Sequence, residues 1–146
     1  MDVKLANIKA RMFSDKWIEE PDAEGHFPTN GDRFAAQEIR KKADPLAFTM
    51  TGFLLQAISA GWHYKSPAQI AEIGDKVGRE RMQVIHGVLD RMITTPHGEV
   101  LAAELGGQEK GLTVIMVEGK AHGLPMEWRR EFTKAVAALV EKTESM

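Results

Sequence analysis

Residues 112–117, LTVIMV, form the only clear β-strand pattern in the sequence, because β-branched and apolar side chains are concentrated there. One strand alone leaves its backbone N–H and C=O groups unpaired, so it requires a neighbour. Three neighbours fit: residues 99–105 folded back as a hairpin, an irregular segment near the N-terminus, or the same strand of a second subunit. The alanine and glutamate content of residues 99–105 also favours a helix there. The pattern predicts a mainly α (α+β) protein with one strand or hairpin near residues 99–118.

Helix signals account for most of the remaining chain. Three pairs of a capping residue and a proline mark helix starts, at Asp44-Pro45, Ser66-Pro67 and Thr95-Pro96. Residues 46–60 carry apolar side chains on both sides of a helix, which predicts a central, buried helix. Residues 82–93 carry one continuous apolar stripe and predict the best-formed helix of the chain. We expect a compact bundle of five or six helices around the 46–60 helix.

The length of the chain predicts a single domain over residues 1–146. N-terminal helices within residues 3–43 and a C-terminal helix over residues 125–143 would pack on a central unit formed by residues 45–118. The longest uncharged run, residues 46–62, is too short to cross the hydrocarbon layer and holds several polar side chains, so no membrane contact is expected. The first residues lack the apolar stretch of a secretory signal, and the expected location is cytoplasmic.

Composition and spacing exclude several kinds of chemistry. The sequence has no cysteine, which excludes disulfides, thiolate metal sites and cysteine nucleophiles. Its five histidines show no metal-ligand spacing, so neither a metal nor another cofactor is expected. The net charge of −2 argues against a general polyanion binder, although it leaves room for a local basic patch. No GxSxG, HExxH or phosphate-loop motif is present, which favours a protein that is not an enzyme.

The stretch SPAQIAEIGDKVGRERMQVIHGVLDRM, residues 66–92, predicts a short helix, a break and a second helix. With a preceding helix and a following hairpin, this order is similar to that of winged-helix DNA-binding domains. We therefore expect a small intracellular binding protein, in its most concrete form a winged-helix-like regulator of transcription. The side chains expected to contact base edges are Arg79, Gln83 and His86, and those expected to contact phosphates are Lys76 and Lys110. Ordinary packing of two helices explains the same stretch, and Asp90 on the expected reading face would repel phosphate.

Two other functions fit the sequence. A non-catalytic, homo-oligomeric adaptor or assembly protein, for example a homodimer, would associate through its terminal helices and residues 112–117. The interface anchors expected in those helices are Trp17, Met126 and Trp128. A small enzyme would instead use His122, in the glycine-flanked loop GKAHGLP, or His86 as an acid–base group. The absence of any concave pocket around His86 or His122 would exclude the enzyme.

Overall fold

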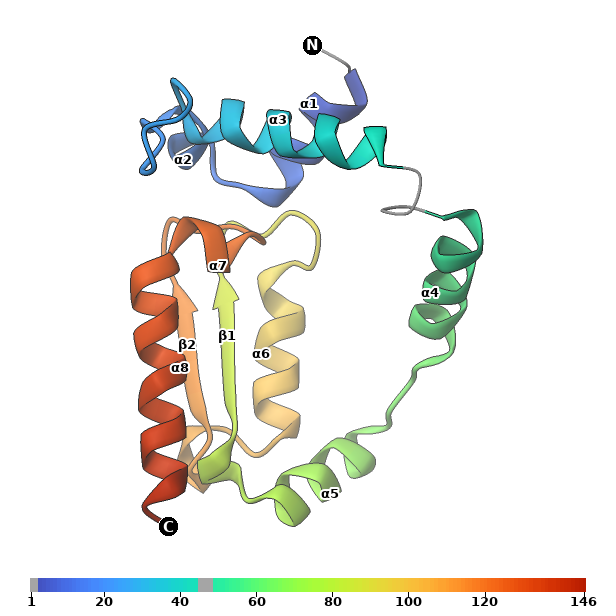
Figure 1. The fold of residues 1–146 in the computed structure, drawn as a ribbon. Helices are drawn as coiled ribbons and strands as arrows, with labels where there is room; N and C mark the ends of the chain where they lie inside the picture. The colour runs from blue at the N-terminus through green and yellow to red at the C-terminus, as the bar shows by residue number, and fades with distance from the viewer. Residues whose placement is uncertain (1–2, 45–48) are drawn as a thin grey trace. The chain divides into compact units, whose positions relative to one another are not determined.

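The computed structural model describes residues 3–44 and 49–146 (Figure 1). It confirms a mainly α protein with one pair of strands among the described residues. The proline of the predicted Asp44-Pro45 helix start lies outside the described residues. None of the described helices combines the length and the apolar character needed to cross a lipid bilayer.

Contacts within the chain divide it into two compact units. The helical unit consists of the residues up to Lys9 together with residues 15–65. The α/β unit consists of residues 10–14 and 66–146, and it contains the whole candidate site. This division does not test the single domain expected over residues 1–146, which stays a prediction.

The helical unit contains α1 (Val3–Met12, whose last three residues belong to the α/β unit), α2 (Asp15–Glu19), α3 (Asn30–Ala43) and α4 (Met50–Trp62). Its buried apolar side chains include Leu5, Trp17 and Phe34. The expectation of a buried central helix over residues 46–60 is wrong for its described part, since α4 has no buried residue. An apolar pattern on all sides predicts burial only where other elements surround the helix, and the described core cluster lies in the α/β unit.

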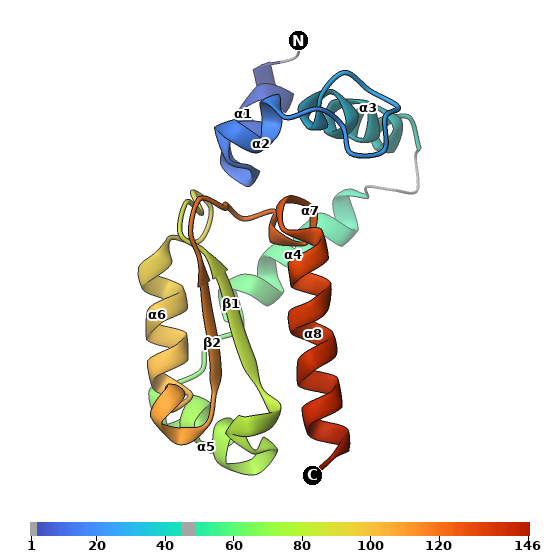
Figure 2. The ribbon, with the colours of Figure 1, turned by 90° about the vertical axis from the view of Figure 1, so that its left-hand side faces the viewer.

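The α/β unit is built around β1 (Gln83–Gly87), α6 (Thr95–Glu104) and β2 (Thr113–Val117). The two strands are parallel, in a register that runs from Gln83 opposite Thr113 to Gly87 opposite Val117. Parallel neighbours need a crossover connection, which α6 supplies. α6 covers one face of the strand pair, and α8 (Arg129–Glu144) covers the other (Figures 1 and 2). The remaining helices are α5 (Pro67–Val77), before β1, and α7 (Leu124–Glu127), after β2.

Residues 82–93 form a strand and a loop, so the helix predicted there is wrong. A parallel strand that is covered on both faces has a nearly continuous run of apolar residues, and over two turns such a run also matches a helical stripe. The core cluster that covers the α6 face consists of Val84, Ala102, Leu105 and Leu112. The strand at 112–117 pairs with β1, and not with any of the three neighbours expected. The segment at residues 99–105, for which helix and hairpin were both open, is helical as far as Glu104.

Candidate functional site

A cavity of about 470 Å³ lies against β1 and reaches the loops that follow β1 and β2. In parallel sheets, ligands bind at the carboxyl ends of the strands, because the loops that follow the strands converge there. The cavity is lined by Gln83, Val84, Ile85, His86, Gly87, Asp90, Ile93, His97, Gly98, Leu101, His122 and Leu124. Mainly apolar walls with a few polar side chains are typical of sites for small molecules.

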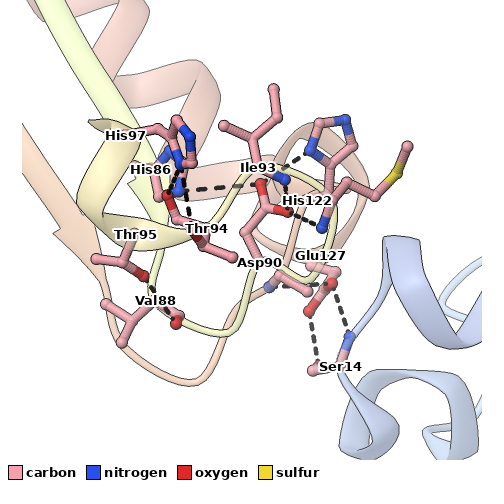
Figure 3. A network of polar contacts seen from close by, with 12 residues as sticks. Ser14, His86, Val88, Asp90, Ile93, Thr94, Thr95, His97, His122 and Glu127 are labelled. Carbon is pink, nitrogen blue, oxygen red and sulfur yellow. Dashed lines mark hydrogen bonds and ion pairs between the residues drawn. The ribbon is translucent and has the colours of Figure 1, made fainter. Parts of the chain in front are cut away.

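Asp90, in the loop after β1, is at the centre of the polar contacts in this cavity (Figure 3). Its Oδ1 accepts hydrogen bonds from the backbone N–H groups of Met92 (2.7 Å) and Ile93 (2.9 Å). Its Oδ2 lies 2.8 Å from His122 Nδ1. Burial acts to raise the pKa of Asp90, but these hydrogen bonds outweigh burial and hold the pKa below its usual value. Asp90 is therefore an ionised carboxylate that accepts a hydrogen bond from the Nδ1–H group of His122.

His122 reaches Asp90 because the loop after β2 folds against the loop after β1. Leu89 N–H donates to Lys120 O at 2.8 Å, which joins the two loops directly. The His122 side chain is 32% exposed, whereas that of Asp90 is only 5% exposed. With Nδ1 donating to Asp90, Nε2 is the unprotonated nitrogen of the neutral ring and can accept a proton.

Gly87, the last residue of β1, permits the close approach of these loops. A Cβ at this position would collide with Ala121 O and would lie 2.6 Å from Lys120 O. Both are backbone atoms, so the contact could not be relieved by a rotamer change. A residue without a side chain at position 87 is therefore required to bring His122 beside Asp90.

The buried carboxylate of Glu127, in α7, holds the loop after β2 from the other side (Figure 3). Its Oε1 accepts hydrogen bonds from the backbone N–H groups of Ser14 (2.9 Å) and Ala121 (3.3 Å). Its Oε2 accepts a hydrogen bond from the Ser14 hydroxyl at 2.7 Å. Ala121 directly precedes His122, so Glu127 fixes the backbone that carries the histidine.

His86 and His97 also line the cavity, but neither has the contacts of His122. His97 Nδ1 lies 3.1 Å from the hydroxyl of Thr94, at the start of α6. His86 is 12% exposed, and its buried Nε2 lies 3.9 Å from Asp90 Oδ2, too far for a hydrogen bond. Within the described ranges, no group of three histidine, cysteine or acidic side chains could hold a metal ion.

The residues expected to contact DNA do not share one helix face, because the expected recognition helix is a strand and a loop. Gln83 and His86 lie on opposite faces of β1, and Lys110 ends the short 3₁₀ helix η2 (Gln108–Lys110). The order of helices expected for a winged-helix domain is therefore wrong, because a strand stands where the recognition helix was expected. DNA contact itself stays a prediction for Lys76, Arg79, Gln83, His86 and Lys110.

Arg79 has structural contacts in the α/β unit. Its guanidinium Nε donates to Leu105 O at 2.6 Å, and the same group pairs with Asp75. These contacts tie the end of α5 to the end of α6. Lys76 pairs with Glu72 at 2.6 Å on the exposed side of α5, an arrangement that contributes little to stability.

The expected interface anchors differ in exposure. Trp17 is buried in the helical unit and accepts a hydrogen bond at its carbonyl from the Asn30 side chain (3.2 Å). Met126 and Trp128 are half-buried in α7 and at the α7–α8 junction. A role for these three residues in self-association stays a prediction.

The pairing of Asp90 with His122, and its support by Glu127 and Ser14, were not predicted from the sequence. A usable signal was present, since Asp90 and His122 each follow an apolar run by a few residues. The loops that follow two paired parallel strands meet at one edge of the sheet, which would have placed these residues together.

No protein-family model matches the chain, and neither a curated protein nor a solved structure matches it. The function is therefore inferred from the geometry and chemistry of the cavity. The contact between Asp90 and His122 is the most informative feature there.

Proposed function

We propose that the protein is a hydrolytic enzyme in which His122 is the acid–base group and Asp90 orients it. The observation that carries this proposal is the 2.8 Å contact between His122 Nδ1 and Asp90 Oδ2 inside the cavity. It corresponds to the third function expected from the sequence, a small enzyme with a histidine acid–base group. The pocket that this function requires around His122 and His86 is present.

The chemistry follows from the hydrogen bond. Asp90 accepts a hydrogen bond from Nδ1–H, so the lone pair of Nε2 is available to a water molecule in the cavity. As the oxygen attacks a carbonyl carbon, its proton moves to Nε2, and the Asp90 carboxylate stabilises the imidazolium that forms. The imidazolium then returns the proton to the leaving alcohol when the ester bond breaks. Asp90 stays ionised throughout.

The order of the two residues supports a hydrolase. The acid follows one parallel strand and the histidine follows the next strand in the chain. Hydrolases that carry a catalytic triad on a parallel sheet have their acid and histidine in this order. This chain shares with those hydrolases only the order of the acid and the histidine, so the support for the reaction comes from the residues of the cavity.

The lining of the cavity indicates the class of substrate. Its apolar side chains include Ile93, Leu101 and Leu124, and no lysine or arginine is among the described residues that line it. A charged substrate would therefore lack a counter-ion, because the Asp90 carboxylate already faces His122. The substrate that fits best is an uncharged ester with a short apolar acyl group.

Hydrolysis of 4-nitrophenyl butyrate by the purified chain tests the proposal. His122→Gln removes the base, and we expect the rate to fall at least about a hundredfold, towards that of buffer. His63→Gln is the matched control, because His63 is exposed in the helical unit and has no part in the cavity. Circular dichroism establishes that both variants are folded. Equal rates for wild type and His122→Gln would refute the proposal.

We also propose self-association through the free edge of β1, as a second function that a separate observation favours. β1 pairs only with β2 among the described residues. Met82 O accepts from Thr113 N, and Val88 N donates to Val117 O, so even-numbered residues face β2. Backbone groups alternate in direction along a strand, so those of Gln83 and Ile85 face away from β2. Two copies could pair at this edge in a symmetric dimer.

Sedimentation equilibrium tests the second function. Ile85→Pro removes an N–H that faces away from β2, so it should abolish pairing between copies and keep the β1–β2 pair. We expect a dimeric wild type and a monomeric variant with similar far-ultraviolet circular dichroism. A monomeric wild type at high protein concentration would exclude self-association as a function of this edge.

A further inference from the structure

His86 is a largely enclosed histidine for which the proposed reaction has no use. It lies on β1 with its ring against Gly98 of α6, where a Cβ would come within 2.8 Å of the ring carbon Cγ. Its side chain is 12% exposed, and Nε2 is buried without a hydrogen-bond partner. The dashed line from His86 in Figure 3 marks its longer contact with Asp90. Buried polar atoms nearly always have a partner, so an exception calls for a physical explanation.

The nearest charged group is the carboxylate of Asp90. Two backbone N–H groups occupy its Oδ1, whereas Oδ2 accepts only from His122 among the hydrogen bonds of the described residues. A carboxylate oxygen has two acceptor positions, so Oδ2 can take a second donor. His86 Nε2 lies 3.9 Å from Oδ2, about one ångström beyond a hydrogen bond. Hydrogen bonds within catalytic sites often shorten when a substrate binds.

We propose that His86 is a positioning residue, whose Nε2–H closes on Asp90 Oδ2 when the cavity is occupied. The carboxylate is then held between two imidazole rings and keeps the Nδ1–H tautomer of His122. This inference rests on the proposed function, because it concerns the orientation of the same base. Direct contact of His86 with substrate does not fit, since Nε2 is closed to solvent.

The surroundings of His86 favour this role. The other titratable groups that line the cavity are Asp90 from the loop after β1, His97 from α6 and His122 from the loop after β2. No cationic or further acidic side chain lines the cavity in the described part of the chain to compete for the Asp90 carboxylate. The ring of His86 lies close to Gly98, so the gap of 3.9 Å to Asp90 Oδ2 would close through a movement of the loop that carries Asp90.

Two variants separate the hydrogen bond from packing. His86→Phe keeps an aromatic ring without a donor, and His86→Gln keeps an N–H donor near the position of Nε2. For 4-nitrophenyl butyrate we expect His86→Phe to lower kcat about tenfold with little change in KM, because His122 spends more time in the wrong tautomer. His86→Gln should recover most of the wild-type kcat. Equal losses in both variants, or no loss in His86→Phe, would overturn the proposal.

A measurement on the wild type keeps the test independent of folding of the variants. Nitrogen-15 shifts of the imidazole rings report which ring nitrogen carries the proton, and we expect His86 to carry it on Nε2. A proton on Nδ1 alone would leave an unprotonated Nε2 facing a carboxylate and would overturn the proposal. The proposed function fails separately, through unchanged hydrolysis in His122→Gln, so the two failures are distinguishable.

Discussion

Two buried aspartates, one in each unit, are held in similar ways but have different partners. Asp22, in the helical unit, accepts backbone N–H groups of its own loop and pairs with Arg33 Nε at 3.2 Å. Asp90, in the α/β unit, also accepts backbone N–H groups of its own loop, but its side-chain partner is His122. In both residues burial acts to raise the pKa, and hydrogen bonds and charge outweigh it, so each pKa lies below its usual value.

The difference in partner separates a structural contact from a chemical one. Arginine keeps its proton at all ordinary pH values, so the pair between Asp22 and Arg33 can only hold the loop at residues 22–27 against α3. Histidine gains and loses a proton near neutral pH, and the ring of His122 faces a cavity. Asp22 and Asp90 are thus buried and hydrogen-bonded in similar ways, and their partners predict different roles. The arginine predicts a role in stability for Asp22, and the histidine predicts a role in acid–base chemistry for Asp90.

The largest expected effect is on hydrolysis. Asp90→Asn presents an amide to His122, so the wrong ring tautomer is favoured, and we expect the rate to fall about a hundredfold or more. Asp22→Asn should leave the rate per folded molecule unchanged. Measurement of kcat for 4-nitrophenyl butyrate in both variants checks the contrast. Equal rate losses in the two variants would show that the aspartates do not differ in role.

Gly87→Ala should give the next largest effect. The added methyl group would collide with the backbone of residues 120 and 121 and push His122 away from Asp90. We expect a loss of activity of about tenfold or more and a lower Tm, because a 1 Å displacement of a catalytic group can have this effect. Gly61→Ala is the matched control, since a Cβ there meets nothing within 4 Å. Wild-type activity in Gly87→Ala would show that the two loops do not need this approach.

Asp22→Asn should lower the thermal stability of the protein. The change leaves the buried Arg33 guanidinium with a weaker partner, because an amide carries no charge. We expect a Tm lower by roughly 5–10 °C, measured by circular dichroism, with hydrolysis intact. A Tm within about 1 °C of wild type would mean that the loop at residues 22–27 is held by its other contacts.

The smallest effect is expected in the acid dependence of stability. Because the folded-state pKa of each aspartate is lowered, its contribution is present above the unfolded pKa of about 3.9 and is lost as pH falls through the folded pKa. The Tm of the wild type should therefore fall more steeply below about pH 4 than that of Asp22→Asn. Thermal melts over that range measure the slopes. Parallel curves would contradict the lowered pKa of Asp22.

Local signals predicted several elements well. The capping pair Ser66-Pro67 marks the start of α5, where Ser66 Oγ accepts from Gln69 N–H at 3.3 Å, and Thr95-Pro96 marks the start of α6. The strand expected at 112–117 is β2. Each of these signals involves only residues that are close together in the sequence, so the sequence alone is enough to find them. β1 was missed because its apolar run fits a helix as well as a covered strand, and only β2 and α6 decide between them.

The site was predicted only in part, because local patterns do not contain its long-range contacts. His122 and His86 were both proposed as acid–base groups, and both line the cavity. Asp90 was expected on the reading face of a recognition helix, whereas its side-chain partner is His122, 32 residues away. That contact exists only because β1 and β2 pair in parallel and Gly87 lets their loops meet. No local pattern specifies such a pairing.

The tautomer of His122 in the wild type tests the central claim most directly. A long-range proton–nitrogen-15 spectrum of the imidazole rings, recorded at about pH 8 where histidine is ordinarily neutral, reports it. We predict a proton on Nδ1, hydrogen-bonded to Asp90, and an unprotonated Nε2, with a shift towards the other tautomer in Asp90→Asn. A proton on Nε2 in the wild type would contradict the account, because His122 could not then act as the base.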